Sequence, residues 1–228
     1  MVPRSPDPLR MYLVLRRGAI ATLARAGELA GGAAVACLRA FGDDPDHQET
    51  IAQWRERPGK VCLRARTLAQ WEQVLIEAGA VVAGDPDGEA VAALAPRRRS
   101  ERGPLLERLQ AMSTAHAPAP ARADDGDRRA ALTYALNPSA AMSSGKTVAQ
   151  VAHASVMADD RGAFEDWVAA GCPGRVLAPD AATFESLAAR SDCVARVVDA
   201  GLTEVAPGTV TVIALAPRPA DALPAGLR

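Results

Sequence analysis

The stretch Met142-Ser-Ser-Gly-Lys-Thr-Val-Ala-Gln-Val-Ala-His-Ala154 has the spacing of an amphipathic helix that opens after Ser143 or Ser144. At about 100° per residue, Lys146, Gln150 and His153 fall on one stripe. The opposite side is apolar or small and suits packing. Two interpretations of the stripe are open: a solvated face with a chance lysine and histidine, or a functional site.

Lysine is rare in this chain. Of 26 basic residues only Lys60 and Lys146 are lysine, so arginine is the usual cation. Lysine differs from arginine because its compact ammonium can approach an oxyanion or a phosphate as a point charge. The choice of lysine at position 146 therefore favours a functional stripe.

The sequence around this helix occurs twice, at a constant offset of 121 between residues 11–37 and 132–158. Further matches follow in the same order: Trp54 with Trp167, 58–61 with 173–176, and 93–97 with 214–218. Such ordered matches favour a tandem duplication. It predicts one domain at 10–112, a Pro- and Ala-rich linker at 113–129, and a second domain at 130–218.

Short apolar runs and helical spacing alternate in both copies, which indicates an α/β fold. Strands are expected at 11–15, 60–63, 81–82, 90–95, 132–136, 175–177, 194–198 and 210–216. Helices are expected at 22–41, 68–80, 105–112, 143–158, 164–170 and 181–190.

The two copies differ at the polar stripe. At the same offset, Arg25, Leu29 and Gly32 stand where the later copy has Lys146, Gln150 and His153. The packing pattern is kept and the stripe is lost, so the N-terminal copy is interpreted as degenerate. Because one copy is expected to fold without the stripe, the later copy must carry it for another purpose.

A second candidate cluster lies at 197–209. Asp199 follows a β-branched run and so is expected at the carboxyl end of a strand, where α/β sheets usually bind ligands. Gly201 and Pro207-Gly208 shape a loop that can bring Thr203 and Thr209 close to it. The alternative is an aspartate that caps its own turn, with threonines as turn residues.

Composition narrows the function classes. Four cysteines without CxxC spacing indicate buried reduced thiols rather than a zinc site, so neither a metal nor a cofactor is expected. No apolar run approaches the roughly 20 residues of a membrane span, and the N-terminus lacks the apolar region of a signal peptide. The expected compartment is the cytoplasm, without a membrane partner.

Charge is unevenly divided. Residues 131–218 hold 6 basic and 9 acidic residues, whereas 10–112 hold 15 and 13, with 97–99 as the densest basic patch. Nucleic-acid binding needs a basic surface. One hypothesis is that the N-terminal copy supplies phosphate contacts and acts as the second subunit of a pseudo-dimer. The alternative is a packing partner only.

Residues 144–154, the Trp–turn–strand unit and 199–209 together resemble the archaeal/eukaryotic-type (type II) peptidyl-tRNA hydrolases over about 131–218. The resemblance implies a three-layer α/β/α domain around a four-stranded mixed sheet, and by duplication two such domains in tandem. It also implies hydrolysis of the ester between peptide and tRNA, with peptidyl-tRNA as the partner and no metal.

By position in the family motifs, the resemblance assigns functional roles to these residues: Lys146, His153, Asp199, Thr203 and Thr209 as catalytic, and Gln150, Gly145 and Gly208 as substrate-binding. The chain departs from the family pattern at Leu202, where a basic residue is common, and at the acidic Glu204. Both departures remove positive charge beside the site.

A mechanism consistent with these residues is attack of water on the ester carbonyl. Asp199 or His153 would orient or deprotonate the water. Lys146 would stabilise the oxyanion or the neighbouring terminal phosphate. The threonine hydroxyls would position water and substrate.

Three rival functions remain. Ser-Ser-Gly-Lys-Thr imitates part of a nucleotide-binding P-loop, but Ala140 replaces the glycine that this motif needs. The others are a non-catalytic RNA- or protein-binding module and a hydrolase of another small ester or amide.

Overall fold

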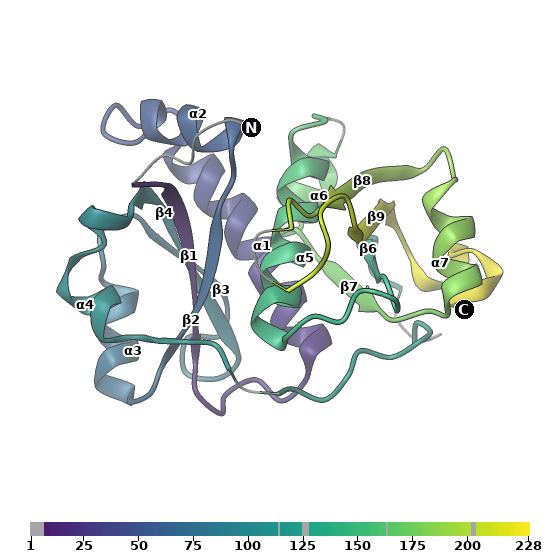
Figure 1. The fold of residues 1–228 in the computed structure, drawn as a ribbon, viewed down its shortest axis with the longest axis horizontal. Coiled ribbons are helices and arrows are strands. Elements are labelled where there is room, and N and C mark those ends of the chain that lie inside the picture. Colours follow the sequence, from purple (N-terminus) through teal and green to yellow (C-terminus); the bar gives the residue numbers. More distant parts are fainter. Residues whose placement is uncertain (1–6, 114, 125–127, 163, 202–203) are drawn as a thin grey trace.

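The computed structural model describes residues 7–113, 115–124, 128–162, 164–201 and 204–228, which form two mixed β-sheets with helices between and outside them (Figure 1). The first sheet has the order β3-β4-β1-β2-β5, with β1 Leu9–Arg16, β2 Lys60–Ala65, β3 Ala80–Gly84, β4 Ala90–Arg98 and β5 Gln110–Ala111. The second has the order β7-β6-β9-β8, with β6 Ala131–Leu136, β7 Gly174–Leu177, β8 Cys193–Val198 and β9 Val210–Arg218. The α/β prediction is confirmed.

The first sheet departs from the prediction of four strands. The helix expected at 105–112 ends early, as α4 (Gly103–Arg108), and residues 110–111 instead pair antiparallel with β2. The short edge strand satisfies backbone groups of β2 that helical continuation would leave exposed.

Both sheets share one strand pattern. The first strand of each half pairs parallel with the second and antiparallel with the fourth, and the third pairs antiparallel with the fourth. A register shift occurs at the same place in both, between Arg10 and Tyr12 and between Ala131 and Thr133. A β-bulge bends a strand locally, so the two first strands bend at equivalent points.

The two tryptophans of the matched segments make the same hydrogen bond. The indole of Trp54 donates to the carbonyl of Gly59 at 2.9 Å, and that of Trp167 donates to the carbonyl of Pro173 at 2.8 Å. These bonds correct the sequence match of 58–61 with 173–176 by one residue. Lys60 is therefore the structural counterpart of Gly174.

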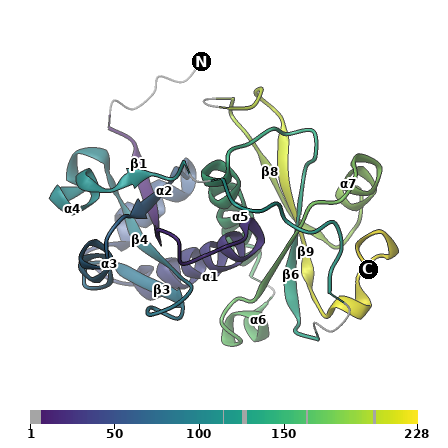
Figure 2. The same ribbon diagram turned by 90° about the horizontal axis from the view of Figure 1, so that it is seen from below.

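Helices α1 (Leu23–Phe41) and α5 (Ser144–Asp159) form a central layer between the sheets (Figure 2). Glycines on α1 allow this contact: a Cβ at Gly27 would lie 3.4 Å from Val151, and one at Gly31 would lie 3.2 Å from the Ser155 hydroxyl. One hydrophobic cluster contains residues of both halves. The halves thus share a core.

The remaining helices close the layers. On the outer face of the first sheet lie α3 (Leu68–Leu75) and α4, and on that of the second lies α7 (Ala181–Ala188). Helices α2 (Gln48–Glu56) and α6 (Glu165–Ala169) contribute their tryptophans to the central core. Helix α3 ends five residues before the predicted end at 80, where the chain has already turned into β3.

The described part of 113–129 runs along the surface and is bonded to both halves. The Ala117 carbonyl accepts from Leu23 N at 3.0 Å, at the first residue of α1. The Pro120 carbonyl accepts from Ala178 N at 2.7 Å, after β7. This segment therefore has the composition of a linker but is held in place by hydrogen bonds, and its path brings His116 beside the start of α5.

Candidate active site

Helix α5 begins where the sequence predicts, because Ser143 is its N-cap. The Ser143 hydroxyl accepts from Lys146 N at 3.3 Å, and its carbonyl accepts from the Thr147 hydroxyl at 3.0 Å. These bonds satisfy donors that an uncapped helix start leaves open. They fix Lys146 in the first turn, facing the loop after β8.

Asp199 is the centre of the site. The ammonium of Lys146 and the amide of Gln150 both donate to its Oδ2, the latter at 2.6 Å, and Gly201 N donates to Oδ1 at 2.8 Å. Its side chain is only 6% exposed. Burial alone would raise the pKa of Asp199, but the bonds from Lys146, Gly201 and Gln150 outweigh it and hold that pKa below its usual value. Asp199 is therefore a carboxylate at neutral pH.

The loop after β8 holds this aspartate in place by two backbone hydrogen bonds. Asp199 N donates to the Thr209 carbonyl at 2.9 Å, and Gly208 N donates to the Asp199 carbonyl at 2.8 Å. The Thr209 hydroxyl donates within the loop, to the Ala206 carbonyl at 2.8 Å. Thr209 thus lies beside Asp199 but uses its hydroxyl for the turn, while Thr203 and Leu202 lie outside the described residues.

The N-terminal half contains a matching turn without the site. Asp85 N donates to the Glu89 carbonyl at 3.0 Å, and the Asp85 side chain accepts from Asp87 N at 3.1 Å. Arg25, which lies 121 residues before Lys146 in the sequence, instead donates to Glu89 at 3.1 Å. The turn explains one hydrogen bond to each aspartate, since each accepts a backbone N–H on one carboxylate oxygen. The bonds from Lys146 and Gln150 to Asp199 are additional to this turn.

Glu204, which the sequence marks only as a loss of positive charge, has a structural role. Its carboxylate accepts from Ser143 N at 2.6 Å and from the Ser143 hydroxyl at 2.8 Å. An acidic group at a helix N-terminus also interacts favourably with the helix dipole. Glu204 therefore holds the loop after β8 against the start of α5.

His153 lies further along α5 and is half-buried. Burial, together with the nearby charges of Lys60 and Lys146, lowers the pKa of His153 to about 3. The imidazole is therefore neutral at physiological pH.

Lys60 is the residue that sequence reasoning missed here. It begins β2 in the N-terminal half, and its buried ammonium lies 4.6 Å from the ring centroid of Trp54, without a hydrogen-bond partner among the described residues. Burial lowers the pKa of Lys60 to about 7. The rarity of lysine that singles out Lys146 was an available signal for Lys60 too.

The predicted substrate-binding glycines have structural contacts. A Cβ at Gly145 would lie 2.7 Å from the Met112 carbonyl, so the helix start packs directly on the linker. Gly208 has φ +82, which suits glycine, and its amide supports Asp199. All four cysteines are free and buried, as predicted.

These features define a mixed α/β domain with a small polar site at the carboxyl edge of its sheet, formed by a lysine, a glutamine and an aspartate. The family model described as peptidyl-tRNA hydrolase PTH2 matches residues 132–225. The C-terminal half of the chain is thus similar to this family over residues 132–225. No solved structure matches the chain. Among the residues that the structure describes, no helix is long and apolar enough to cross a membrane.

Proposed function

We propose that the C-terminal half hydrolyses the ester bond between peptide and tRNA in peptidyl-tRNA, without a metal. The observation that carries this proposal is the convergence of Lys146 and Gln150 on one carboxylate oxygen of Asp199. It occurs in the half that matches the family, and the equivalent turn at Asp85 lacks it.

The chemistry needs a water to attack the ester carbonyl while the ribose oxygen leaves. Asp199 fixes the Lys146 ammonium, whose remaining protons can bind the oxyanion that develops on the carbonyl oxygen. The proton released by the water passes through Asp199 or His153 to the leaving ribose oxygen. Both of these groups have lowered pKa values and are weak bases, so positioning and charge stabilisation make the larger contribution.

Of the other family positions, Thr203 and Thr209 are proposed as catalytic residues that position water and substrate, and Gln150, Gly145 and Gly208 as substrate contacts. Gln150 and the amide of Gly208 hold Asp199 in place, and Thr203, Thr209 and Gly145 border the same loop and helix start in the sequence. A peptidyl-tRNA substrate places the reaction in translation, and we infer a cytoplasmic location.

We also propose that residues 10–112 are a degenerate copy of the domain at 130–218, joined by the linker at 113–129. The shared strand order, the equivalent register shifts and the two indole bonds support this duplication. The shared core and the packing of α1 on α5 support a pseudo-dimer within one chain.

The test compares Lys146→Met and Asp199→Asn with matched changes in the N-terminal half, Arg25→Met and Asp85→Asn. The first pair is expected to lower the rate of peptide release from peptidyl-tRNA by about 10²–10³, and the second pair to leave it near wild type. Circular dichroism and thermal melting check that each variant folds. Full activity in both Lys146→Met and Asp199→Asn refutes the site.

A panel of small esters and amides, assayed beside peptidyl-tRNA, separates the rival functions. Faster hydrolysis of a small ester than of peptidyl-tRNA favours a different hydrolase. Binding of tRNA without turnover of any substrate favours a non-catalytic module.

A further inference from the structure

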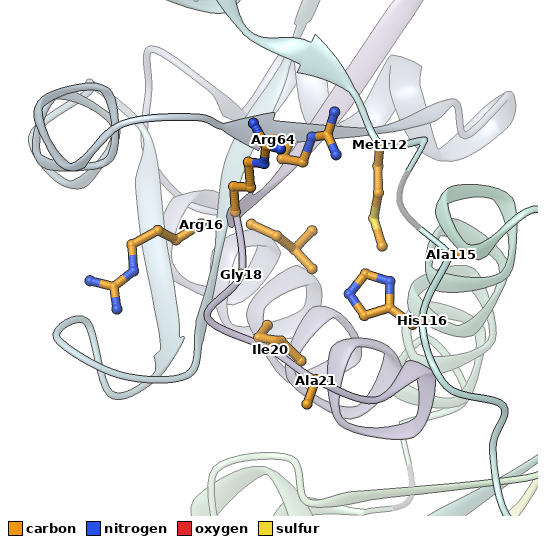
Figure 3. Close-up of a pocket in the computed structure, with 10 residues that line it drawn as sticks. Arg16, Gly18, Ile20, Ala21, Arg64, Met112, Ala115 and His116 are labelled. Atoms are coloured by element: carbon orange, nitrogen blue, oxygen red, sulfur yellow. The ribbon is translucent and has the colours of Figure 1, made fainter.

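A cavity of about 90 Å³ lies where β1 and β2 end and the linker passes (Figure 3). Three arginines and a histidine line it, and its lining holds no carboxylate: Arg16, Arg17, Arg64 and His116. Figure 3 shows Arg64, Met112 and His116 bordering one space, whereas Arg16 points away to the Asp87 carbonyl at 3.0 Å. The volume is roughly three times that of a water molecule in the liquid, enough for a small anionic group.

The local sequence concentrates positive charge at this edge. Strands β1 and β2 are parallel neighbours with Leu15 opposite Arg64, so their carboxyl ends meet. Residues 15–22 and 60–67 contain four arginines at or just beyond these ends and no acidic residue: Arg16, Arg17, Arg64 and Arg66. The carboxyl edge is where α/β sheets usually bind ligands, and a planar guanidinium matches the geometry of phosphate oxygens.

The cavity adjoins the start of the active-site helix. His116 N donates to the Ser144 hydroxyl at 3.1 Å, and the Met112 carbonyl lies against Gly145. Lys146 is the next residue along α5. An anion in the cavity would thus lie close to the first turn of the helix that presents Lys146 to Asp199.

The basic patch singled out from the sequence, at 97–99, lies elsewhere. Strand β4 is antiparallel to β1, with Arg98 opposite Leu9, which places the patch at the other edge of the sheet. Arg97 is also engaged, with Glu77 at 3.1 Å and the Ala78 carbonyl at 2.7 Å. The patch therefore lies at the opposite end of the strands from the cavity.

We propose that the arginine-lined cavity binds a phosphodiester group of the tRNA acceptor strand whose peptide ester is hydrolysed at Asp199. This inference rests on the proposed function. It assigns the N-terminal half and the linker a direct part in substrate binding, and it supplies positive charge that the acidic C-terminal half lacks. Free phosphate shares the same chemistry, so the test must separate the two sources.

The test measures the affinity of deacylated tRNA over a range of salt concentrations for Arg17→Ala and for Arg17→Ala/Arg64→Ala. Arg98→Ala/Arg99→Ala removes the same charge at the opposite edge, from two exposed side chains, and is the matched control. Loss of one phosphate contact is expected to reduce the slope of log K against log salt by about 0.7–0.9 and the affinity at low salt roughly tenfold. Arg17 is exposed, so the single variant remains informative if the double variant folds poorly.

A slope equal to that of the control in both Arg17 variants overturns the proposal. A second result also overturns the proposal: inorganic phosphate binds wild type but not the double variant, and the salt slope of tRNA binding is the same in both. The cavity would then be a site for free phosphate. Either outcome is independent of catalysis.

A second arm uses two substrates: peptidyl-tRNA and an N-acetyl-aminoacyl ester of adenosine, which has no phosphate. The ratio of kcat/KM for peptidyl-tRNA to kcat/KM for the adenosine ester is expected to fall about tenfold in Arg17→Ala/Arg64→Ala. In the control variant this ratio is expected to equal that of wild type. If wild type hydrolyses neither substrate, the proposed function fails, while the salt slope still decides for or against the cavity.

Discussion

Replacing Lys60 with methionine is expected to stabilise the protein at neutral and acidic pH. The pKa of this lysine falls from 10.5 to about 7 because its ammonium is buried. At about 1.36 kcal/mol per pKa unit, the charge costs up to about 5 kcal/mol. The cation–π contact with Trp54, at 4.6 Å, belongs to this balance because it favours the charged form. The expected gain in the free energy of unfolding is therefore up to about 5 kcal/mol.

The pH dependence follows from the direction of the shift. Below pH 7 both the folded and unfolded states carry the proton, so the full cost of burying the charge is present. Between about pH 7 and 10.5 the unfolded chain binds more protons than the folded chain, so the stability of wild type rises with pH by up to about 1.4 kcal/mol per unit. The methionine variant lacks this rise, and its advantage should disappear by about pH 10.5.

The assay is urea unfolding of wild type and Lys60→Met at several pH values, combined with NMR of a lysine-labelled chain. Only two lysine side-chain signals are expected, and each is assigned by its own methionine variant. Lys146→Met is the control, since it should keep the pH slope that Lys60 causes. A Lys60 signal that titrates near 10, with equal pH dependence of stability in wild type and Lys60→Met, would refute the burial of this charge.

Two further predictions concern α5. With a pKa of about 3, His153 should contribute no limb near pH 6.5 to the profile of kcat/KM above pH 5, and His153→Gln should leave the shape of that profile unchanged; a limb between pH 6 and 7 that the variant loses would contradict this. Gly145→Ala should lower stability by about 1–3 kcal/mol, because its methyl group would lie 2.7 Å from the Met112 carbonyl. Gly32→Ala on α1, whose nearest contact is 3.5 Å, is the control, and equal melting temperatures for the two would exclude the tight contact.

Much of the fold follows from local sequence. The start of α5 at Ser144 was predictable because a capping serine and a regular apolar period depend on neighbouring residues only. The strands of both halves were likewise found at short apolar runs. The failure at 105–112 has a tertiary cause, since residues 110–111 become a strand only because the edge of β2 is available to pair with them.

The features of the site likewise divide into those that the local sequence indicates and those that depend on tertiary contacts. The sequence singled out Lys146, Gln150 and Asp199 as candidates, two on one helical stripe and the third at a strand end, and the structure brings these three side chains together. The sequence could not show that Glu204 bonds Ser143, the N-cap of α5, since that contact joins residues 61 positions apart.

The contribution of the N-terminal half to this region was decided only by tertiary structure. Lys60 approaches His153, and the arginines of β1 and β2 approach the start of α5, because α1 and α5 pack together and set one half against the other. Periodicity and capping act over a few residues. Burial of a charge and the opening of a cavity depend on which distant surfaces meet, and no local pattern in the chain specifies that.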